Sequence, residues 1–325
     1  MANKYKVAVV TMSDKGSIGQ RTDESGPLIT SIMEDWGLAE VIETVLIPDD
    51  LEIIKNTLAV GADNPFVILH ISDIHLAETD EYDSAERRQF AEDRRNTYFS
   101  FARKMLEEVR DYVKQTGYPL INTGDMLDFI TPENLRISRE FTKDTNMIMV
   151  AGNHEYWHCE KNRFSYDDVY ETYAVKNKSL AKVQEYFEND IRFFCREMNG
   201  VNIVCMDDTD YHIEASLFEK LKKVEEQGKP ILLFMHIPLY SPHLGKEAKG
   251  TLNAAPQFFE NCHPVDVFER TPDELTCQIC DHIRKSPYIK CVISGHTHEN
   301  AEIIGFDEQD QIVTGINTLR EVTVI

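Results

Sequence analysis

Apolar runs and amphipathic stretches alternate along most of the chain, and their order predicts an α/β protein. Phe66–Ile71 is a nearly unbroken apolar run of the kind found in buried strands. The same reasoning predicts further strands at Leu120–Asn122, Met147–Val150, Arg192–Glu197, Val201–Met206, Ile231–Met235, Ile289–Ser294, Ala301–Phe306, Gln311–Asn317 and Glu321–Ile325. Helical periodicity predicts helices at Asn96–Gln115, Glu133–Lys143, Ser179–Asn189, Ser216–Gln227 and Pro272–Arg284. Strands that alternate with helices and then follow one another predict a layered sandwich with a mixed sheet.

The first sixty residues form a separate pattern. They predict strand Lys6–Met12, helix Asp23–Gly37, strand Glu40–Ile47 and helix Asp49–Val60. The breaker cluster Gly61–Pro65 then reads as a linker. We therefore expect an N-terminal segment over residues 1–63 and a larger domain over residues 64–325.

Charge and composition narrow the function classes. The chain has 325 residues, with 34 Lys+Arg against 56 Asp+Glu, and a net charge of −22. Such acidity argues against broad binding to nucleic acid or to a membrane surface. Neither a signal peptide nor an apolar run long enough to span a bilayer is evident, and the seven scattered cysteines read as free thiols. These features predict a cytoplasmic protein that does not enter membranes.

Five short polar motifs each follow a predicted strand. They are Asp73-Ile74-His75, Gly124-Asp125-Met126-Leu127-Asp128, Gly152-Asn153-His154-Glu155, His236, and Gly295-His296-Thr297-His298. Catalytic and ligand-binding groups of open α/β sheets collect at the carboxyl ends of strands, so the five motifs should meet in one crevice. Each motif alone is typical of a turn or a buried histidine, but the ordered set favours a site rich in metal ligands.

This ordered set resembles the signature of the calcineurin-like metallophosphoesterase family over residues 66–325. The resemblance implies an α/β fold, a layered α/β/β/α sandwich of the metallo-dependent phosphatase type. The small truncated α/β segment precedes it.

The resemblance also implies two divalent metal ions as cofactors. By motif, Asp73, His75 and His298 would hold one ion. Asn153, His236 and His296 would hold the other, and Asp125 would bridge the pair. Mixed imidazole, carboxylate and amide ligands suit Mn, Fe or Zn, and do not choose among them.

The implied activity is a dinuclear phosphohydrolase. It would cleave small phosphomono- or phosphodiesters by in-line attack of a metal-bridging hydroxide. His154 would protonate the leaving group, with Asp128 holding its imidazole in the required tautomer. The alternative hypotheses are a non-catalytic binding protein on the same fold and a molybdenum-cofactor-related protein acting through the N-terminal segment.

The N-terminal segment, at about residues 5–60, resembles the opening of the molybdopterin-binding family of Mog and MoaB type proteins. The matching text is Val9-Val10-Thr11-Met12-Ser13-Asp14-Lys15-Gly16, Asp23-Glu24-Ser25-Gly26-Pro27 and Ile47-Pro48-Asp49-Asp50. The chain contains no Gly-Gly dipeptide, so the Gly-Gly-Thr-Gly loop that would cradle a pterin phosphate is missing. We therefore expect the segment to form a homo-oligomer contact rather than to bind a pterin.

Three features near the motifs carry weaker predictions. The arginines of Arg87–Arg95 read as a solvated helix face, or else one of them contacts a substrate phosphate. The long segment Ser241–Phe268 reads as a loop that overhangs the site and biases substrate choice. Asp207, Asp208 and Asp210 favour turn and cap chemistry over a third metal site.

Overall fold

The computed structural model divides the chain into two compact units. One comprises Met1–Phe66 with Thr323–Ile325, and the other comprises Val67–Val322. The structure describes residues 5–37, 39–50, 53–54, 65–156, 172–244, 251–252, 272–305 and 309–324. Within these residues, no helix combines the length and apolar character that crossing a bilayer requires.

In the smaller unit, the described residues between 5 and 50 form a two-stranded parallel sheet with two helices. Strands β1 (Tyr5–Met12) and β2 (Ala39–Ile47) pair along their whole length, and α1 (Asp14–Ser17) and α2 (Ser25–Asp35) lie between them in sequence. The Asp23 carboxylate accepts the backbone N–H groups of Ser25 and Gly26 at 3.0 Å each, which satisfies the start of α2. The predicted strand–helix–strand order is confirmed. The predicted helix Asp49–Val60 and the linker Gly61–Pro65 lie mostly outside the described residues.

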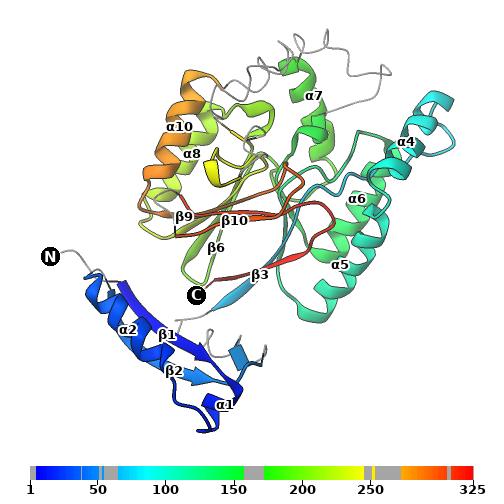
Figure 1. Ribbon diagram of the computed structural model, residues 1–325. Helices are drawn as coiled ribbons and strands as arrows, with labels where there is room; N and C mark the ends of the chain where they lie inside the picture. Colours follow the sequence, from blue (N-terminus) through cyan, green and yellow to red (C-terminus); the bar gives the residue numbers. More distant parts are fainter. Residues whose placement is uncertain are drawn as a thin grey trace. The chain divides into compact units, whose positions relative to one another are not determined.

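The larger unit contains two sheets (Figure 1). The four-stranded sheet has the order β12-β3-β4-β5, and the six-stranded sheet has the order β10-β11-β9-β8-β7-β6. The first sheet consists of β3 (Phe66–Ile71), β4 (Leu120–Asn122), β5 (Ile148–Met149) and β12 (Arg320–Val324). The second consists of β6 (Phe193–Met198), β7 (Val201–Met206), β8 (Ile231–Phe234), β9 (Ile289–Ser294), β10 (Ala301–Ile303) and β11 (Gln311–Val313).

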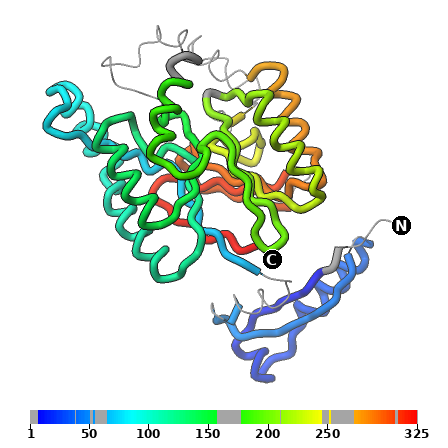
Figure 2. The backbone as a smooth tube through the Cα atoms, turned by 180° about the vertical axis from the view of Figure 1, so that it is seen from behind, coloured from blue at the N-terminus to red at the C-terminus, as the bar shows by residue number. Residues whose placement is uncertain are grey.

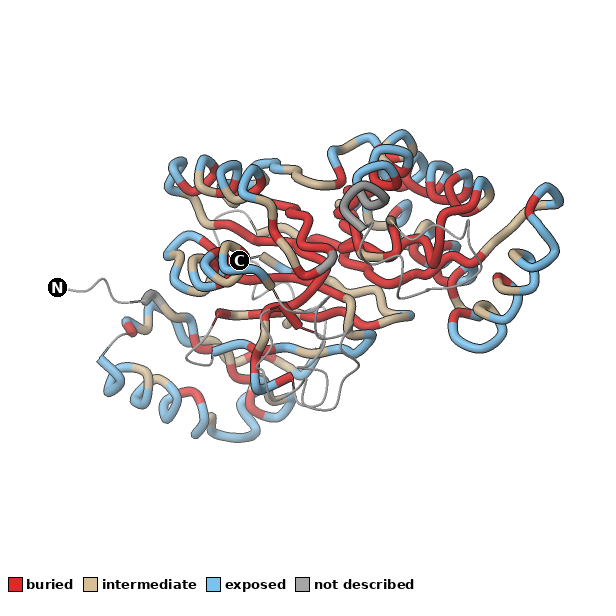
Figure 3. Tube along the Cα trace, turned by 90° about the horizontal axis from the view of Figure 1, so that it is seen from above, coloured by how far each residue is buried: buried red, intermediate tan, exposed pale blue. Residues whose placement is uncertain are grey.

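Helices cover the outer face of each sheet. Apolar side chains of α5 (Ala102–Thr116) and α6 (Pro132–Thr145) pack on the four-stranded sheet, whereas those of α8 (Ala215–Glu225) and α10 (Glu274–Lys285) pack on the six-stranded sheet. Between the sheets, the ring of His70 on β3 meets the ring of Phe234 on β8 edge-on, with centroids 5.8 Å apart. Strands β4, β5 and β8 are buried along their whole length, and Figure 3 shows the exposed outward faces of the helices. The expected α/β/β/α sandwich is confirmed.

One predicted helix boundary was wrong for a physical reason. The expected helix Asn96–Gln115 is α5, which begins only at Ala102, because Asn96 and Thr97 end the preceding helix α4 (Ala85–Thr97) and Tyr98–Phe101 separates the two. Phe99 in this break is buried and its ring stacks on His75, with centroids 4.2 Å apart and planes at 12°. Helix α4, which starts at an N-cap made by Ser84, then projects from the body of the unit (Figure 2). A tertiary contact thus interrupts a sequence that could continue as a helix.

The remaining helix near residue 180 is also shifted. Helix α7 covers Thr172–Gln184 instead of the predicted Ser179–Asn189. It ends at Gln184, whose side chain accepts the backbone N–H of Ile191 at 2.9 Å and donates to the carbonyl of Asn189 at 2.7 Å. The segment after the helix is therefore tied down as a turn, which the apolar periodicity did not indicate.

Candidate metal centre

The five polar motifs meet because backbone hydrogen bonds tie their loops together. The backbone N–H of Asp73 donates to the Gly124 carbonyl at 3.0 Å, and that of His75 donates to the Asp125 carbonyl at 2.8 Å. Within the six-stranded sheet, Gly295 N–H donates to the His236 carbonyl at 3.0 Å, and across the two sheets His236 Nδ1 donates to the Thr123 carbonyl at 2.7 Å. The loops that follow β3, β4, β8 and β9 therefore form one continuous floor.

Gly295 is required where the two sheets come together. A Cβ atom at this position would lie 1.9 Å from Ser72 Oγ and 2.3 Å from Asp73 Oδ2, both of which belong to the opposite sheet. No side chain fits in that space without moving the Asp73 loop. The glycine thus lets the His296 and His298 loop approach Asp73 closely.

Backbone strain is concentrated among these polar residues. Five of them have left-handed backbone conformations, with φ between 53° and 67°: Asp73, His75, Asp125, His296 and His298. Such conformations are uncommon for residues with a Cβ, and surrounding structure must stabilise them. Their concentration in one cluster indicates that side-chain placement here outweighs local backbone preference.

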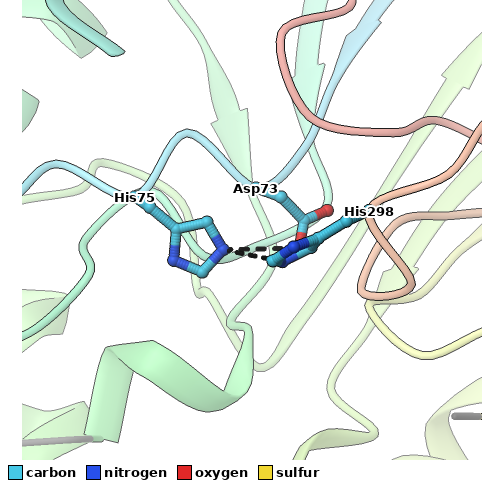
Figure 4. Close-up of side chains that lie close together, drawn as sticks. All are labelled: Asp73, His75 and His298. Carbon is cyan, nitrogen blue, oxygen red and sulfur yellow. Dashed lines mark hydrogen bonds and ion pairs between the residues drawn. The ribbon is translucent and has the colours of Figure 1, made fainter. Parts of the chain in front are cut away.

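One group of potential ligands joins both sheets (Figure 4). His75 Nε2 lies 3.0 Å from His298 Nε2, and Asp73 Oδ1 lies 3.8 Å and 3.6 Å from these two nitrogens. The His75 and Asp73 side chains are buried, whereas the His298 side chain is 40% exposed. Figure 4 shows the three side chains converging on a common point.

A second group lies on the other side of Asp125. Asn153 Oδ1 lies 2.9 Å from His236 Nε2 and 3.1 Å from His296 Nδ1, and these two nitrogens are 3.1 Å apart. The other ring nitrogen of His236 donates to the Thr123 carbonyl at 2.7 Å, so Nε2 is the nitrogen that faces the cluster. Three ligand-type atoms therefore surround one small volume.

Asp125 lies between the two groups. Its Oδ2 atom is 3.7 Å from His75 Nε2 and 3.4 Å from His236 Nε2, while its Oδ1 atom accepts the His154 backbone N–H at 2.9 Å. Although burial opposes it, the charges of His236 and His154 hold the pKa of the Asp125 carboxyl well below its usual range. The carboxylate thus remains available to both groups.

The electrostatics of the cluster favour cations. Burial alone would lower the pKa of His236, but the Asp125 carboxylate, helped by Asp73 and Asp208, raises it to about 10. A field that draws a proton onto a buried imidazole also draws a metal ion, which would compete with that proton.

An unpaired buried carboxylate oxygen is independent evidence that these side chains suit a metal ion. Asp73 Oδ1 is buried and has no hydrogen-bond partner among the described residues, although the Asp73 carboxylate accepts the His296 N–H through Oδ2 at 2.9 Å. An unpaired buried carboxylate oxygen costs free energy unless a cation approaches it. Imidazole, carboxylate and amide oxygen donors together suit Mn, Fe or Zn.

His154 lies beside the Asp125 carboxylate. Its Nδ1–H donates to the backbone carbonyl of Asp128 at 2.7 Å, so Nε2, which lies 3.9 Å from Asp125 Oδ2, faces the cluster. Burial lowers the pKa of this imidazole, but the charge of Asp125 and the bonds to Asp128 outweigh burial and raise it. Asp128 therefore fixes the tautomer of His154, and it does so mainly through its carbonyl.

The Asp128 carboxylate has other partners. Its Oδ1 atom lies 3.1 Å from His75 Nδ1 and 3.4 Å from His154 Nδ1, and the carboxylate accepts two hydrogen bonds at 2.6 Å from the Arg94 guanidinium. Arg94 and Asp128 thus orient His75, a contact that the motif spacing did not indicate. The sequence placed the arginines of this stretch on a solvated face or on a substrate phosphate, whereas the structure pairs the partly exposed Arg94 side chain with the buried Asp128 carboxylate.

The sequence also missed two residues that support the site. Glu155 is fully buried and its carboxylate accepts the backbone N–H groups of Asp125, Leu127 and Gly152, at 2.8, 3.1 and 2.7 Å. Burial and the nearby Asp125 charge raise its pKa to about 7. Tyr211 places its hydroxyl 2.7 Å from His296 Nε2. Glu155 had a sequence signal in its place after Gly-Asn-His, whereas Tyr211 had none.

Turn chemistry accounts for Asp207 in the acidic cluster after β7, whereas Asp208 makes a contact with a distant loop. Asp207 accepts the N–H and the hydroxyl of Thr209 at 3.0 and 2.6 Å, and Asp208 accepts the backbone N–H groups of His236 and Ile237 at 3.0 Å each. Most of the segment Ser241–Phe268 lies outside the described residues, so its predicted role as a lid stays a prediction.

Similarity to known proteins agrees with this geometry. The model of the calcineurin-like phosphoesterase family matches residues 66–300, which include all five motifs. Among solved structures, a dimetal phosphatase from Danio rerio is 12% identical, with 78% of this chain and 88% of that chain covered and a TM-score of 0.44.

Two further structures are similarly distant. The phosphopantetheinyl hydrolase of Mycobacterium tuberculosis is 16% identical, with 80% and 97% covered and a TM-score of 0.40. The NAD nucleotidase of Haemophilus influenzae is 12% identical, with 80% of this chain but 47% of that chain covered and a TM-score of 0.41. The family match therefore carries the assignment alone. The chain belongs to the calcineurin-like phosphoesterase family and is a hydrolase of phosphate ester bonds.

Proposed function

We propose that the protein is a dinuclear metal-dependent phosphohydrolase acting on small phosphomono- or phosphodiesters. The observation that carries this proposal is the position of Asp125 Oδ2, which lies within 3.7 Å of a ligand-type nitrogen in each of two groups. In this proposal Asp73, His75 and His298 hold one ion. Asn153, His236 and His296 hold the other, and Asp125 is shared.

When bound, two such ions would acidify a shared water molecule and neutralise charge on the phosphoryl oxygens. The chain's own residues would supply the rest of the chemistry. Because the Nδ1–H of His154 is committed to the Asp128 carbonyl, Nε2 carries a proton only in the imidazolium form, which the charge of Asp125 and the bonds to Asp128 favour by raising the pKa of this imidazole. From this position His154 would donate the proton to the leaving oxygen of the ester. Asp128 and Arg94 would keep His75 oriented.

The substrate class follows from charge and from the family. A net charge of −22 opposes long polyanions, whereas a small ester carries few charges into a pocket whose field two bound cations would dominate. We therefore expect hydrolysis of small mono- or diesters and little cleavage of oligonucleotides.

Metal analysis of purified protein tests the proposal. The protein is loaded separately with Mn²⁺, Fe²⁺ or Zn²⁺, its bound metal is counted, and it is assayed on a chromogenic phosphomonoester, a phosphodiester and a single-stranded oligonucleotide. Asp125→Asn should bind fewer ions per chain and lose most hydrolysis. Asp111→Asn, which changes an exposed carboxylate on α5, should match the unaltered protein. Failure of the metal-loaded protein to hydrolyse any ester would contradict the proposal.

For the smaller unit we propose a contact between copies of this chain, and no pterin chemistry. Helix α2 and the residue that caps its C-terminal end turn three large apolar side chains to solvent, Leu28, Ile32 and Trp36, which are 61%, 59% and 58% exposed. Exposed apolar groups of this size favour association.

Mass in solution tests this proposed contact. Ile32→Glu and Trp36→Glu, each in the full chain, should lower the mass of any oligomer, as should removal of residues 1–63. An unchanged mass in all three would count against the contact.

A further inference from the structure

The loop between β7 and α8, residues 207–214, lies outside the five motifs but is held rigidly against the sheets. Arg192 binds both of its ends: its Nε donates to Asp207 Oδ2 at 2.9 Å, and its Nη2 donates to Glu214 Oε1 at 2.7 Å. On the other side, Ile213 N–H donates to the Thr276 hydroxyl on α10 at 3.0 Å. The loop is therefore clamped from two directions.

Two side chains of this loop reach the second ligand group. The Asp208 carboxylate, which is fully buried, accepts the backbone N–H groups of His236 and Ile237 at 3.0 Å each. The Tyr211 hydroxyl lies 2.7 Å from His296 Nε2, and the two rings meet edge-on with centroids 5.6 Å apart. One loop thus contacts both histidines of the group.

Tyr211 is held in a costly conformation to make its contact. Its φ is 61°, in the left-handed region that aromatic residues rarely occupy, and the residue is buried. Strain of this kind persists only where surrounding contacts over-determine it. The Arg192 and Thr276 contacts on either side provide that constraint.

The chemistry of the His296 ring defines what Tyr211 does. His296 Nδ1 points at Asn153 Oδ1 and His236 Nε2, so Nδ1 is the nitrogen available for an ion. A neutral imidazole that ligates through Nδ1 carries its proton on Nε2, and that proton needs an acceptor. The phenol oxygen of Tyr211 is in position to accept it.

We propose that Tyr211 is a positioning residue for the ion held by Asn153, His236 and His296, and that the clamped 207–214 loop is the device that places it. This proposal rests on the proposed function, because it presumes an ion at that group. The corresponding partners of the other histidines lie in or beside the motifs, Thr123 for His236 and Asp128 for His75. Through Tyr211, a loop outside the five motifs would therefore supply the hydrogen-bond partner of a histidine that holds one of the two ions.

The test compares Tyr211→Phe with Tyr288→Phe, which changes a partly exposed tyrosine that follows α10 in the sequence. Stepwise Mn²⁺ and Zn²⁺ affinities are measured by competition with a chelating dye, and thermal unfolding is measured in excess chelator. Loss of a histidine's outer partner typically weakens metal binding about 10- to 100-fold. We expect that loss for one of the two ions in Tyr211→Phe, an unchanged affinity for the other, and no change in Tyr288→Phe.

The metal-free melting temperature separates positioning from general structural support. A positioning role predicts that Tyr211→Phe melts like the unaltered protein in chelator, whereas a structural role predicts a lower temperature and would overturn the proposal. Asp208→Asn weakens the hydrogen bonds from the His236 and Ile237 N–H groups, and it should lower the affinity for the same ion. If unaltered protein binds two ions and Tyr211→Phe binds both equally tightly, Tyr211 has no such role while the proposed function stands. If unaltered protein binds none, both proposals fall together.

Discussion

His70 should make the stability of the metal-free protein fall in mild acid. The residue is fully buried on β3, where Nδ1 lies 2.8 Å from the Thr314 hydroxyl and Nε2 lies 2.9 Å from the Thr123 hydroxyl. Burial, and then the charge of Arg320, lower its pKa from 6.5 to about 3. The perturbation we consider is His70→Gln, which keeps a donor and an acceptor but cannot titrate.

The sign follows from proton uptake. Between about pH 6.5 and pH 3 the unfolded chain binds a proton at this histidine and the folded chain does not, so acid favours unfolding. The stabilisation is complete above the unfolded pKa and decreases by up to about 1.4 kcal/mol for each pH unit below it. At about pH 4.5 the loss from this one group amounts to roughly 3 kcal/mol, a large part of the stability of an ordinary domain.

The assay is urea unfolding in excess chelator, followed by circular dichroism from neutral pH down to about pH 4.5. The free energy of unfolding of the unaltered protein should fall by roughly 3 kcal/mol more than that of His70→Gln over this range. His243→Gln, which removes an exposed imidazole, is the matched control and should follow the unaltered protein. If the curves of His70→Gln and the unaltered protein run parallel, burial does not keep His70 neutral and the reasoning fails.

Three further predictions follow from the site. Arg94→Met leaves the buried Asp128 carboxylate without its two 2.6 Å hydrogen bonds and should lower the free energy of unfolding in urea by about 3 kcal/mol. The control Arg136→Met breaks surface ion pairs and should change it little, so equal unfolding midpoints for the two variants would contradict this prediction. His154→Ala should keep both ions by metal analysis but lose turnover most on esters with poor leaving groups, and full activity with bound metal would remove its role as the acid. Gly295→Ala forces a Cβ within 1.9 Å of Ser72 Oγ and should reduce metal content and soluble yield, so a normal yield of metal-binding protein would show that the loops can separate.

The sequence predicted the parts of this protein that depend on local pattern. Strands Phe66–Ile71, Leu120–Asn122, Val201–Met206 and Ile289–Ser294 were predicted at the bounds observed, because buried strands leave continuous apolar runs. The same rule brought the motifs together, since each follows a strand whose end faces the same crevice.

The sequence did not predict what depends on contacts between distant segments. The break between α4 and α5 exists because Phe99 stacks on His75, and nothing near Phe99 in sequence marks it. Likewise Arg94 was one of several arginines on an amphipathic stretch, and only the fold places it against Asp128. Tyr211 is a further case, because its partner His296 lies 85 residues away.

The origin of the potential ligands has a consequence for the life of the protein in the cell. Asp73, Asp125 and Asn153 follow strands of the four-stranded sheet, whereas His236, His296 and His298 follow strands of the six-stranded sheet. Each bound ion would therefore link the two sheets of the sandwich, and its binding free energy would add to the stability of the fold. Metal starvation would then lower the amount of the protein as well as its activity, because the metal-free protein unfolds more often and is then cleaved by proteases.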